Sequence, residues 1–171
     1  GRTTWDKACA HFIAPESRYY FCNENLRSVF YDGSQWEYEK CNKYQIAISQ
    51  AGYPIKGLHK VIEAAALLCN EFPDIKVKVG GANIFVGNWI KGNSYGIYIR
   101  QLLKKYNLQD QFEFEGFLSA EKMKRLLLES NVFVCPSSIE NSPNSLGEAM
   151  ILGVPCVASD VGGISDMLTH N

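Results

Sequence analysis

The sequence predicts an α/β fold built on a doubly wound parallel sheet, and three observations lead to this prediction. From Tyr44 onward, short apolar runs alternate with longer segments that carry apolar residues at helical spacing. Glycine or proline follows several of these runs, as at Gly80, Gly116 and Pro136, and ends them as strands. Such alternation of strand and helix is typical of a parallel sheet covered by helices.

The first 43 residues are the least regular part of the chain. We predict a helix at residues 4–13, where apolar side chains share one face and Pro15 ends the pattern. A strand is predicted at 18–22, which is rich in tyrosine and phenylalanine, and a helical turn at 25–30. We interpret residues 1–43 as a connector, or as the tail of an upstream domain, rather than as an independent fold.

Residues 44–171 contain the predicted parallel sheet. Its strands are predicted at 45–50, 75–79, 112–115, 131–135 and 155–158. Its helices are predicted at 58–71, 95–106 and 119–129, after Ser142-Pro143, and from about residue 163. Ligands of such sheets bind beyond the carboxyl ends of the strands, so we expect four loops to form the site. These loops are 51–57, 80–94, 116–119 and 136–145.

The loop at 82–94 is longer than such connections usually are and carries Phe85 and Trp89. One interpretation is a surface excursion that packs on its own aromatic residues. The other is a flap over the ligand or a contact to another domain.

Composition and charge exclude several classes of protein. The net charge of -1, without a basic run interleaved with aromatic residues, gives no reason to expect nucleic acid as a partner. Neither a secretory signal nor an apolar run of about 20 residues is visible, and we expect a cytoplasmic location. The six cysteines have no paired short spacing, which favours free thiols over disulfides or a metal site.

The stretch 137–150 carries the strongest indication of a binding site. It follows an apolar run that ends at Pro136, and Ser142 and Pro143 are typical of the N-cap and the first position of a helix. The backbone amides of Asn144 and Ser145 should then be free at a helix N-terminus, where anions bind. The predicted inward stripe of this helix comprises Leu146, Ala149, Met150 and Leu152.

Two acids and one lysine flank this helix start. Glu140 precedes the helix and Glu148 lies inside it, while Lys56 lies in a loop at the same end of the sheet. Each of these residues, taken alone, is equally consistent with a solvated surface charge. Their placement around a strand–loop–helix unit favours a role in binding an anion, and a cation at Lys56 would stabilise charge on a departing diphosphate. Neither a Walker phosphate loop nor a G-x-G-x-x-G turn is present.

Four segments together resemble the donor-binding half of the retaining glycosyltransferases of family 4. The segments are 54–58, 114–119, 138–150 and 153–163, and the resemblance covers roughly residues 44–171. Enzymes of this family have the GT-B fold, in which two Rossmann-like domains face each other. The resemblance therefore implies one half of a GT-B fold and a donor that is a UDP- or GDP-sugar.

The resemblance also assigns roles to individual residues. It implies that Glu148 binds the ribose hydroxyls and that Glu140 binds the transferred sugar. Further implied contacts are the backbone of Asn144, Ser145 and Leu146 with Gly57 and Lys56 at the diphosphate, and the backbone of Phe117 and Leu118 at the base. Such enzymes retain the anomeric configuration, and we expect neither a divalent metal nor another cofactor to be required.

Two departures from the family pattern bear on activity. The family commonly has an arginine about five positions before the lysine, where this chain has Gln50-Ala51-Gly52, and Lys91 is one candidate to replace it. The acceptor domain and the C-terminal helices that usually cross back to it are not within the sequence. We expect this part of the enzyme to bind a donor without transferring the sugar.

The full enzyme would use a glycan or a lipid-linked acceptor, bound by the missing N-terminal domain. Peripheral association of the full enzyme with a membrane is compatible with this expectation. Two alternatives remain at this point. One is a nucleotide-sugar-binding module or partner subunit without turnover. The other is a related GT-B epimerase.

Overall fold

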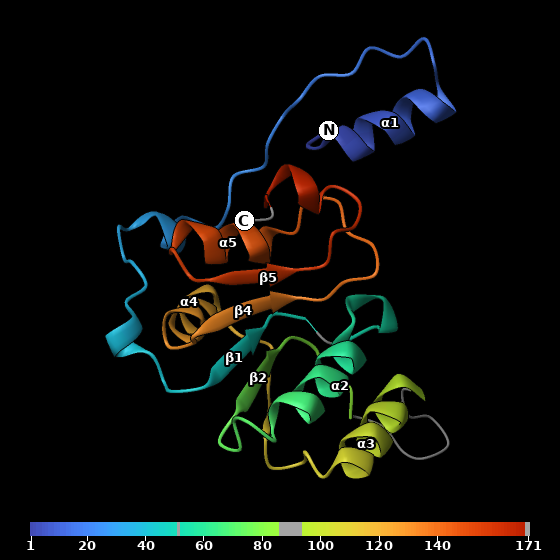
Figure 1. Cartoon of the computed structure of the whole chain (residues 1–171). Coiled ribbons are helices and arrows are strands. Elements are labelled where there is room, and N and C mark those ends of the chain that lie inside the picture. Colours follow the sequence, from blue (N-terminus) through green and yellow to red (C-terminus); the bar gives the residue numbers. More distant parts are fainter. Residues whose placement is uncertain (51, 86–93, 170–171) are drawn as a thin grey trace.

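The computed structural model describes residues 1–50, 52–85 and 94–169, and it contains the predicted sheet (Figure 1). Five strands lie in the order β3-β2-β1-β4-β5, and every neighbouring pair is parallel. The strands are β1 Gln45–Ile48, β2 Lys76–Gly80, β3 Phe112–Gly116, β4 Val132–Cys135 and β5 Cys156–Ala158. The prediction of a doubly wound parallel sheet is confirmed.

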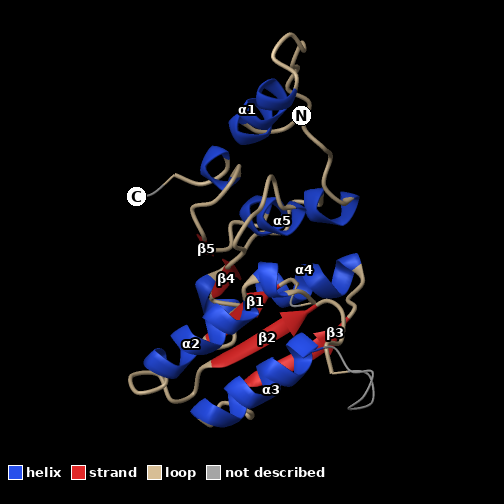
Figure 2. Ribbon diagram, turned by 90° about the vertical axis from the view of Figure 1, so that its right-hand side faces the viewer, coloured by secondary structure: helices blue, strands red, loops and turns tan. Residues whose placement is uncertain are grey.

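Helices cover both faces of the sheet. They are α2 Leu58–Leu68, α3 Ser94–Tyr106, α4 Ala120–Leu128 and α5 Asn144–Ile151. Figures 1 and 2 place α2 and α3 on one face and α4 and α5 on the other. Successive residues of a strand point to opposite faces, and accordingly Ile48 belongs to the core under α2 and α3, while Ala47 belongs to the core under α4 and α5.

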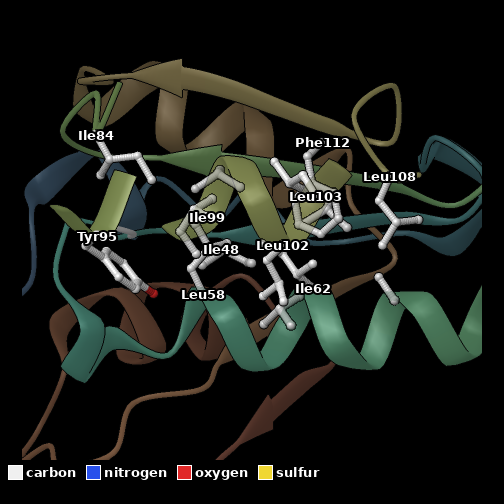
Figure 3. Close-up of a cluster of buried hydrophobic side chains, with 14 residues drawn as sticks. Ile48, Leu58, Ile62, Ile84, Tyr95, Ile99, Leu102, Leu103, Leu108 and Phe112 are labelled. Atoms are coloured by element: carbon white, nitrogen blue, oxygen red, sulfur yellow. The ribbon is translucent and has the colours of Figure 1, made fainter. Parts of the chain in front are cut away.

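Branched aliphatic side chains dominate the core under α2 and α3, which Figure 3 shows. Ile62 of α2 and Ile99 of α3 are fully buried against the strands. At the far end of the core, Phe85 packs edge-to-face on Phe114 of β3, with ring centroids 4.6 Å apart. The expectations for Trp89 and Lys91 in the long loop fall outside the described residues.

The N-terminal connector, residues 1–43, differs in part from its prediction. Helix α1 spans Thr4–Ile13 as predicted and stands apart from the sheet, beyond α5 (Figures 1 and 2). The predicted strand at 18–22 is wrong, because these residues have no regular secondary structure and join no sheet. The aromatic side chains that suggested a strand pack locally instead. Tyr19 donates a hydrogen bond to Asp6 of α1, and its ring lies edge-on to Phe21 at 5.2 Å.

The connector is anchored to the domain by a short 3-10 helix, η1, at Ser28–Tyr31, where a helical turn was expected at 25–30. Phe30 of η1 is 1% exposed and belongs to the core under α4 and α5. A second 3-10 helix, η2, follows at Tyr38–Lys40, and Trp36 donates its indole N–H to the carbonyl of Ser130. The end of the connector is therefore part of the folded domain.

An ion pair between Asp32 and Lys124 gives a test of this anchoring. The hydrogen bond from Lys124 lowers the pKa of Asp32 from 3.8 to about 2, and the amide of Ser34 adds to the effect. A carboxylate with a depressed pKa contributes stability above its unfolded pKa, and this contribution is lost as the pH falls toward 2. Asp32→Asn should therefore lower the free energy of unfolding at pH 5 and lower it less at pH 3, as measured by urea unfolding.

The exposed Asp110 supplies the control, because its carboxylate takes part in no ion pair among the described residues. Asp110→Asn removes an exposed carboxylate without breaking an ion pair, so at pH 5 it should change the unfolding free energy less than Asp32→Asn does. A pH-independent difference between the wild type and Asp32→Asn would contradict the proposed pairing.

Candidate functional site

The site lies where the winding of the sheet changes direction. The chain runs from β1 outward to β2 and β3, and β4 then returns to the other side of β1. Crevices at the carboxyl ends of two such strands are where ligands of doubly wound sheets bind. The loop after β1 and the loop after β4 touch each other there, because the amide of Ser138 donates to the carbonyl of Ile55 at 2.8 Å.

Gly57 allows this close approach of the two loops. Its φ of 75° is in the left-handed region, and it serves as the N-cap of α2. A Cβ atom at this position would lie 1.9 Å from the carbonyl oxygen of Pro136. Only glycine therefore lets the loop that carries Lys56 pack against the loop that carries Glu140.

Lys56 and Glu140 form an ion pair at this contact. The Nζ atom of Lys56 lies 2.6 Å from Oε2 of Glu140, and the side chains are 25% and 16% exposed. The hydroxyl of Ser137 donates to the same carboxylate oxygen at 3.1 Å. The other oxygen, Oε1 of Glu140, has no hydrogen-bond partner among the described residues and can accept one from a ligand. Two residues that are 84 positions apart in sequence are thus brought together as predicted.

Helix α5 begins one residue later than predicted. Pro143 is the N-cap, with φ -69° and ψ 120°, and Ser142 makes no capping hydrogen bond. The carbonyl of Pro143 accepts from the amides of Leu146 and Gly147. Within the described chain the amides of Asn144 and Ser145 have no acceptor, so they remain available to an anion as expected.

The buried face of α5 also departs from the predicted stripe. Leu146, Ala149 and Leu152 are fully buried, whereas Met150 is 38% exposed and the prediction for it is wrong. Glu148 takes the buried place, with only 2% of its surface exposed. Leu146 was expected to contact a ligand, but its side chain lies in the core and its amide is used within the helix start.

An arginine of the connector satisfies the buried carboxylate of Glu148. Nε of Arg27 donates to Oε1 and Nη2 donates to Oε2, both at 2.7 Å. The hydrogen bond to Glu148 raises the pKa of Arg27 above its ordinary value. Since both oxygens of Glu148 are engaged and the side chain is 3% exposed, a ribose can reach it only if Arg27 moves. The expected contact of Glu148 with a ribose stays a prediction.

The connector lies along α5 from its N-terminus to Glu148. Arg2 donates to the side chain of Asn144 at 3.0 Å, and Thr3 donates to Asn141 in the preceding loop. Farther along, Leu26 lies against the helix, because a Cβ atom on Gly147 would come within 3.2 Å of its side chain. The two ends of the segment 1–27 therefore border α5 and the loop before it.

The loop after β3 presents the residues that were expected near a base. Gly116 adopts a left-handed φ of 70°, and its carbonyl accepts from the amide of Gly81 at 2.8 Å, which ties the exits of β2 and β3 together. Phe117 is 85% exposed, whereas Leu118 packs partly against the core under α4 and α5. An exposed phenylalanine next to a fixed turn is available to stack on a flat ligand.

The structure adds Arg27, which sequence reasoning missed. A signal for it was present, because Glu148 lies four residues before the buried Leu152 and thus on the inward side of α5. A carboxylate on that side requires a cation, although its sequence position cannot be read from the pattern.

The described residues contain neither a metal-binding cluster of side chains nor a membrane-spanning helix. Within residues 1–50, 52–85 and 94–169, no three His, Cys, Asp or Glu side chains are close enough together to hold a metal ion. Across the same ranges, no helix is both long enough and apolar enough to span a membrane.

Comparison with known proteins places the chain in a family. The family described as glycosyl transferases group 1 matches residues 34–171. The amylovoran biosynthesis glycosyltransferase AmsK of Erwinia amylovora is 37% identical over 71 residues, which are 38% of this chain and 17% of AmsK. The chain spans between 17% and 30% of the length of the curated relatives it matches.

Solved structures show the same fold. HepE of Anabaena, in complex with UDP and glucose, superposes with a TM-score of 0.65 at 23% identity, covering 75% of this chain and 33% of HepE. The C-terminal domain of the LpcC protein of Francisella tularensis superposes with a TM-score of 0.62 at 22% identity, covering 86% of this chain and 71% of that domain. At these identities the likeness establishes the fold alone. Together with the family match over residues 34–171, it shows that the chain belongs to the glycosyl transferases group 1 family, as the C-terminal half of a GT-B fold.

Proposed function

We propose that the chain is the donor-binding part of a retaining glycosyltransferase that uses a UDP- or GDP-sugar. The observation that carries the proposal is the Lys56–Glu140 pair, which lies at the change of winding between β1 and β4. The free amides of Asn144 and Ser145 open the helix that follows the Glu140 loop. The complex of the structurally similar HepE with UDP and glucose supports the choice of ligand.

The arrangement has the chemistry that such a donor requires. The dipole and free amides of α5 attract the diphosphate, and the ammonium group of Lys56 adds a positive charge beside it. Negative charge grows on the diphosphate as the sugar leaves, so these donors stabilise the transition state more than the bound donor. Glu140 then has its free oxygen, Oε1, for a sugar hydroxyl. In the full-length enzyme, the sugar would pass with retention to a glycan or lipid-linked acceptor.

Titration of UDP, GDP and ADP tests the proposal, with Lys56→Met as the decisive variant. We expect UDP or GDP to bind more tightly than its nucleoside, because the phosphates meet α5 and Lys56. Loss of the ammonium group should weaken binding of the diphosphate by about tenfold in calorimetry.

Lys60 is the matched control for Lys56. It lies in the first turn of α2 and is paired with Glu63 at 3.0 Å. Lys60→Met should leave the affinity within about twofold of the wild type, because an exposed ion pair contributes little. Equal effects of the two substitutions, or no binding of any of the three nucleotides, would refute the proposed site.

A second candidate function is a nucleotide-sugar-binding module without turnover. It is favoured by the sequence before Lys56, where Gln50-Ala51-Gly52 stands in place of the arginine that the family commonly has. Slow hydrolysis of UDP-sugars and GDP-sugars by the full-length protein distinguishes the two functions. Sugar release supports the transferase, whereas donor binding without release supports the module.

A further inference from the structure

The start of helix α1 is bonded to the loop that carries Glu140. Thr3, the N-cap of α1, is 1% exposed, although no residue within α1 is buried. Its hydroxyl donates to the side-chain oxygen of Asn141, the residue that follows Glu140. The side-chain nitrogen of Asn141 donates in turn to Oδ2 of Asp6 at 3.0 Å. The first turn of α1 therefore engages both ends of one amide side chain.

The two groups of α1 that bind this amide are themselves held in place. The hydroxyl of Tyr19 and the amide of Arg2 donate to Asp6 and lower its pKa, so Asp6 is a carboxylate at neutral pH. The amide of Asp6 donates to the hydroxyl oxygen of Thr3 at 3.1 Å. One donor and one acceptor are thus fixed side by side, and they match the oxygen and the nitrogen of the Asn141 side chain.

Close backbone packing holds the same loop from another side. The amide of Gly163, in the segment after β5, donates to the carbonyl of Glu140 at 3.0 Å. A Cβ atom on Gly162 would lie 1.9 Å from that carbonyl oxygen, and one on Gly163 would lie 2.4 Å from the side chain of Thr3. Figure 1 shows the start of α1 close to the segment after β5. The backbone of Glu140 can therefore shift only if one of these contacts breaks.

The direction of the free carboxylate oxygen of Glu140 depends on both ends of its side chain. Lys56 and Ser137 hold the other oxygen, Oε2, and leave Oε1 for a ligand. A glutamate side chain has several rotatable bonds, so Oε1 keeps one direction only while the backbone is fixed as well. A hydrogen bond weakens steeply as its angle departs from linear. The contacts of α1 therefore bear on the part of a ligand that Oε1 meets.

We infer that Thr3 and Asp6, acting through Asn141, are positioning residues for Glu140, so that the N-terminal segment contributes to recognition of the sugar. The inference rests on the proposed function, because it takes Glu140 to bind a hydroxyl of the transferred sugar. It extends the site beyond residues 34–171, the part of the chain that matches the family. Thr3 acts at second hand, because it is buried and its hydroxyl is used by Asn141.

Calorimetric titration of the 171-residue chain tests the inference with two ligands. They are the nucleoside diphosphate that binds the wild type most tightly among UDP, GDP and ADP, and the same nucleotide carrying glucose. Thr3→Val removes the hydroxyl but keeps the shape of the side chain, and Asn141→Ala removes the amide. Each should weaken binding of the glucose-bearing ligand by about fivefold and that of the plain nucleotide by less than about twofold.

A Glu140 variant shows whether the contact acts through this residue. Glu140→Ala alone should weaken binding of the glucose-bearing ligand by about tenfold. In this background Thr3→Val should add no further loss, because nothing remains to be positioned. Thr4→Val is the matched control, because the hydroxyl of Thr4 belongs to the same helix start but donates to Asp166 at 2.7 Å. It should leave both affinities within about twofold of the wild type.

Several outcomes would overturn the inference. Normal binding of the glucose-bearing ligand by Thr3→Val and Asn141→Ala would show that the contact with α1 does not position Glu140. Equal losses for the two ligands, or an equal loss in Thr4→Val, would show a general effect on the site. A loss in Asn141→Ala without one in Thr3→Val would mean that Asn141 contacts the ligand itself, and a further loss in the Glu140→Ala background would separate Thr3 from Glu140.

Other outcomes would refute the proposed function instead. One is failure of the wild type to bind any of the three nucleotides. The other is normal binding of the glucose-bearing ligand by Glu140→Ala, which would remove the sugar contact on which both proposals depend.

Discussion

Arg27→Met is expected to lower the free energy of unfolding by roughly 2–4 kcal/mol, measured by urea denaturation at neutral pH. The substitution leaves Glu148 buried at 2% exposure with neither of its hydrogen-bond donors. Removing one partner of a buried pair is far more damaging than removing both, because the remaining charge is neither solvated nor paired. The expected loss is below that for a fully buried pair, because the guanidinium of Arg27 is 44% exposed.

Substitution of the other member of the ion pair provides the control. Glu148→Met leaves Arg27 free to be solvated, so this variant should lose only about 1 kcal/mol of unfolding free energy. The double variant Arg27→Met/Glu148→Met replaces the pair with two apolar side chains of similar length and should recover most of the stability. A loss in Arg27→Met no larger than that in Glu148→Met would mean that the carboxylate of Glu148 is solvated in the folded protein.

Glu140 and Glu148 differ in whether their partners could be predicted from the sequence. Glu140 and Lys56 could be placed together, because topology alone brings the loops after β1 and β4 to one edge of the sheet. Arg27 could not be found in this way, since it lies in the connector, 121 residues from Glu148. Contacts between an irregular segment and a helix follow from three-dimensional packing and leave no periodic pattern.

The fold itself was largely predictable for a related reason. The order of apolar strands and amphipathic helices from Tyr44 onward is a local pattern, and it determines the class of sheet. The predicted strand at 18–22 fails because aromatic residues also suit irregular, partly buried chain, and here Tyr19 and Phe21 contact Asp6 and Lys7 of α1 rather than a neighbouring strand. The start of α5 shifts by one residue because Pro143 keeps a ψ of 120° and stays outside the helix.

Gly57→Ala is expected to lower the free energy of unfolding by roughly 3–5 kcal/mol. The new Cβ atom would require the left-handed φ of 75° and would lie 1.9 Å from the carbonyl oxygen of Pro136. A backbone oxygen cannot rotate away as a flexible side chain can, so the loops after β1 and β4 must separate. Their separation would stretch the hydrogen bond from Ser138 to Ile55 and move the neighbouring Lys56.

Gly33→Ala isolates the contact from the backbone strain. Gly33 has a similar φ of 85°, but a Cβ atom there would meet nothing within 4 Å. Gly33→Ala should therefore lower the free energy of unfolding by only about 1–2 kcal/mol, which is the cost of the left-handed conformation. The difference in unfolding free energy between Gly57→Ala and Gly33→Ala measures how much the close packing of the loops after β1 and β4 contributes to stability. If this packing positions Lys56, the folded fraction of Gly57→Ala should also bind the nucleoside diphosphate about tenfold more weakly, while Gly33→Ala binds it normally. Equal unfolding free energies for the two variants would show that the loops separate without cost, and the site would then lack the rigidity that the proposed chemistry requires.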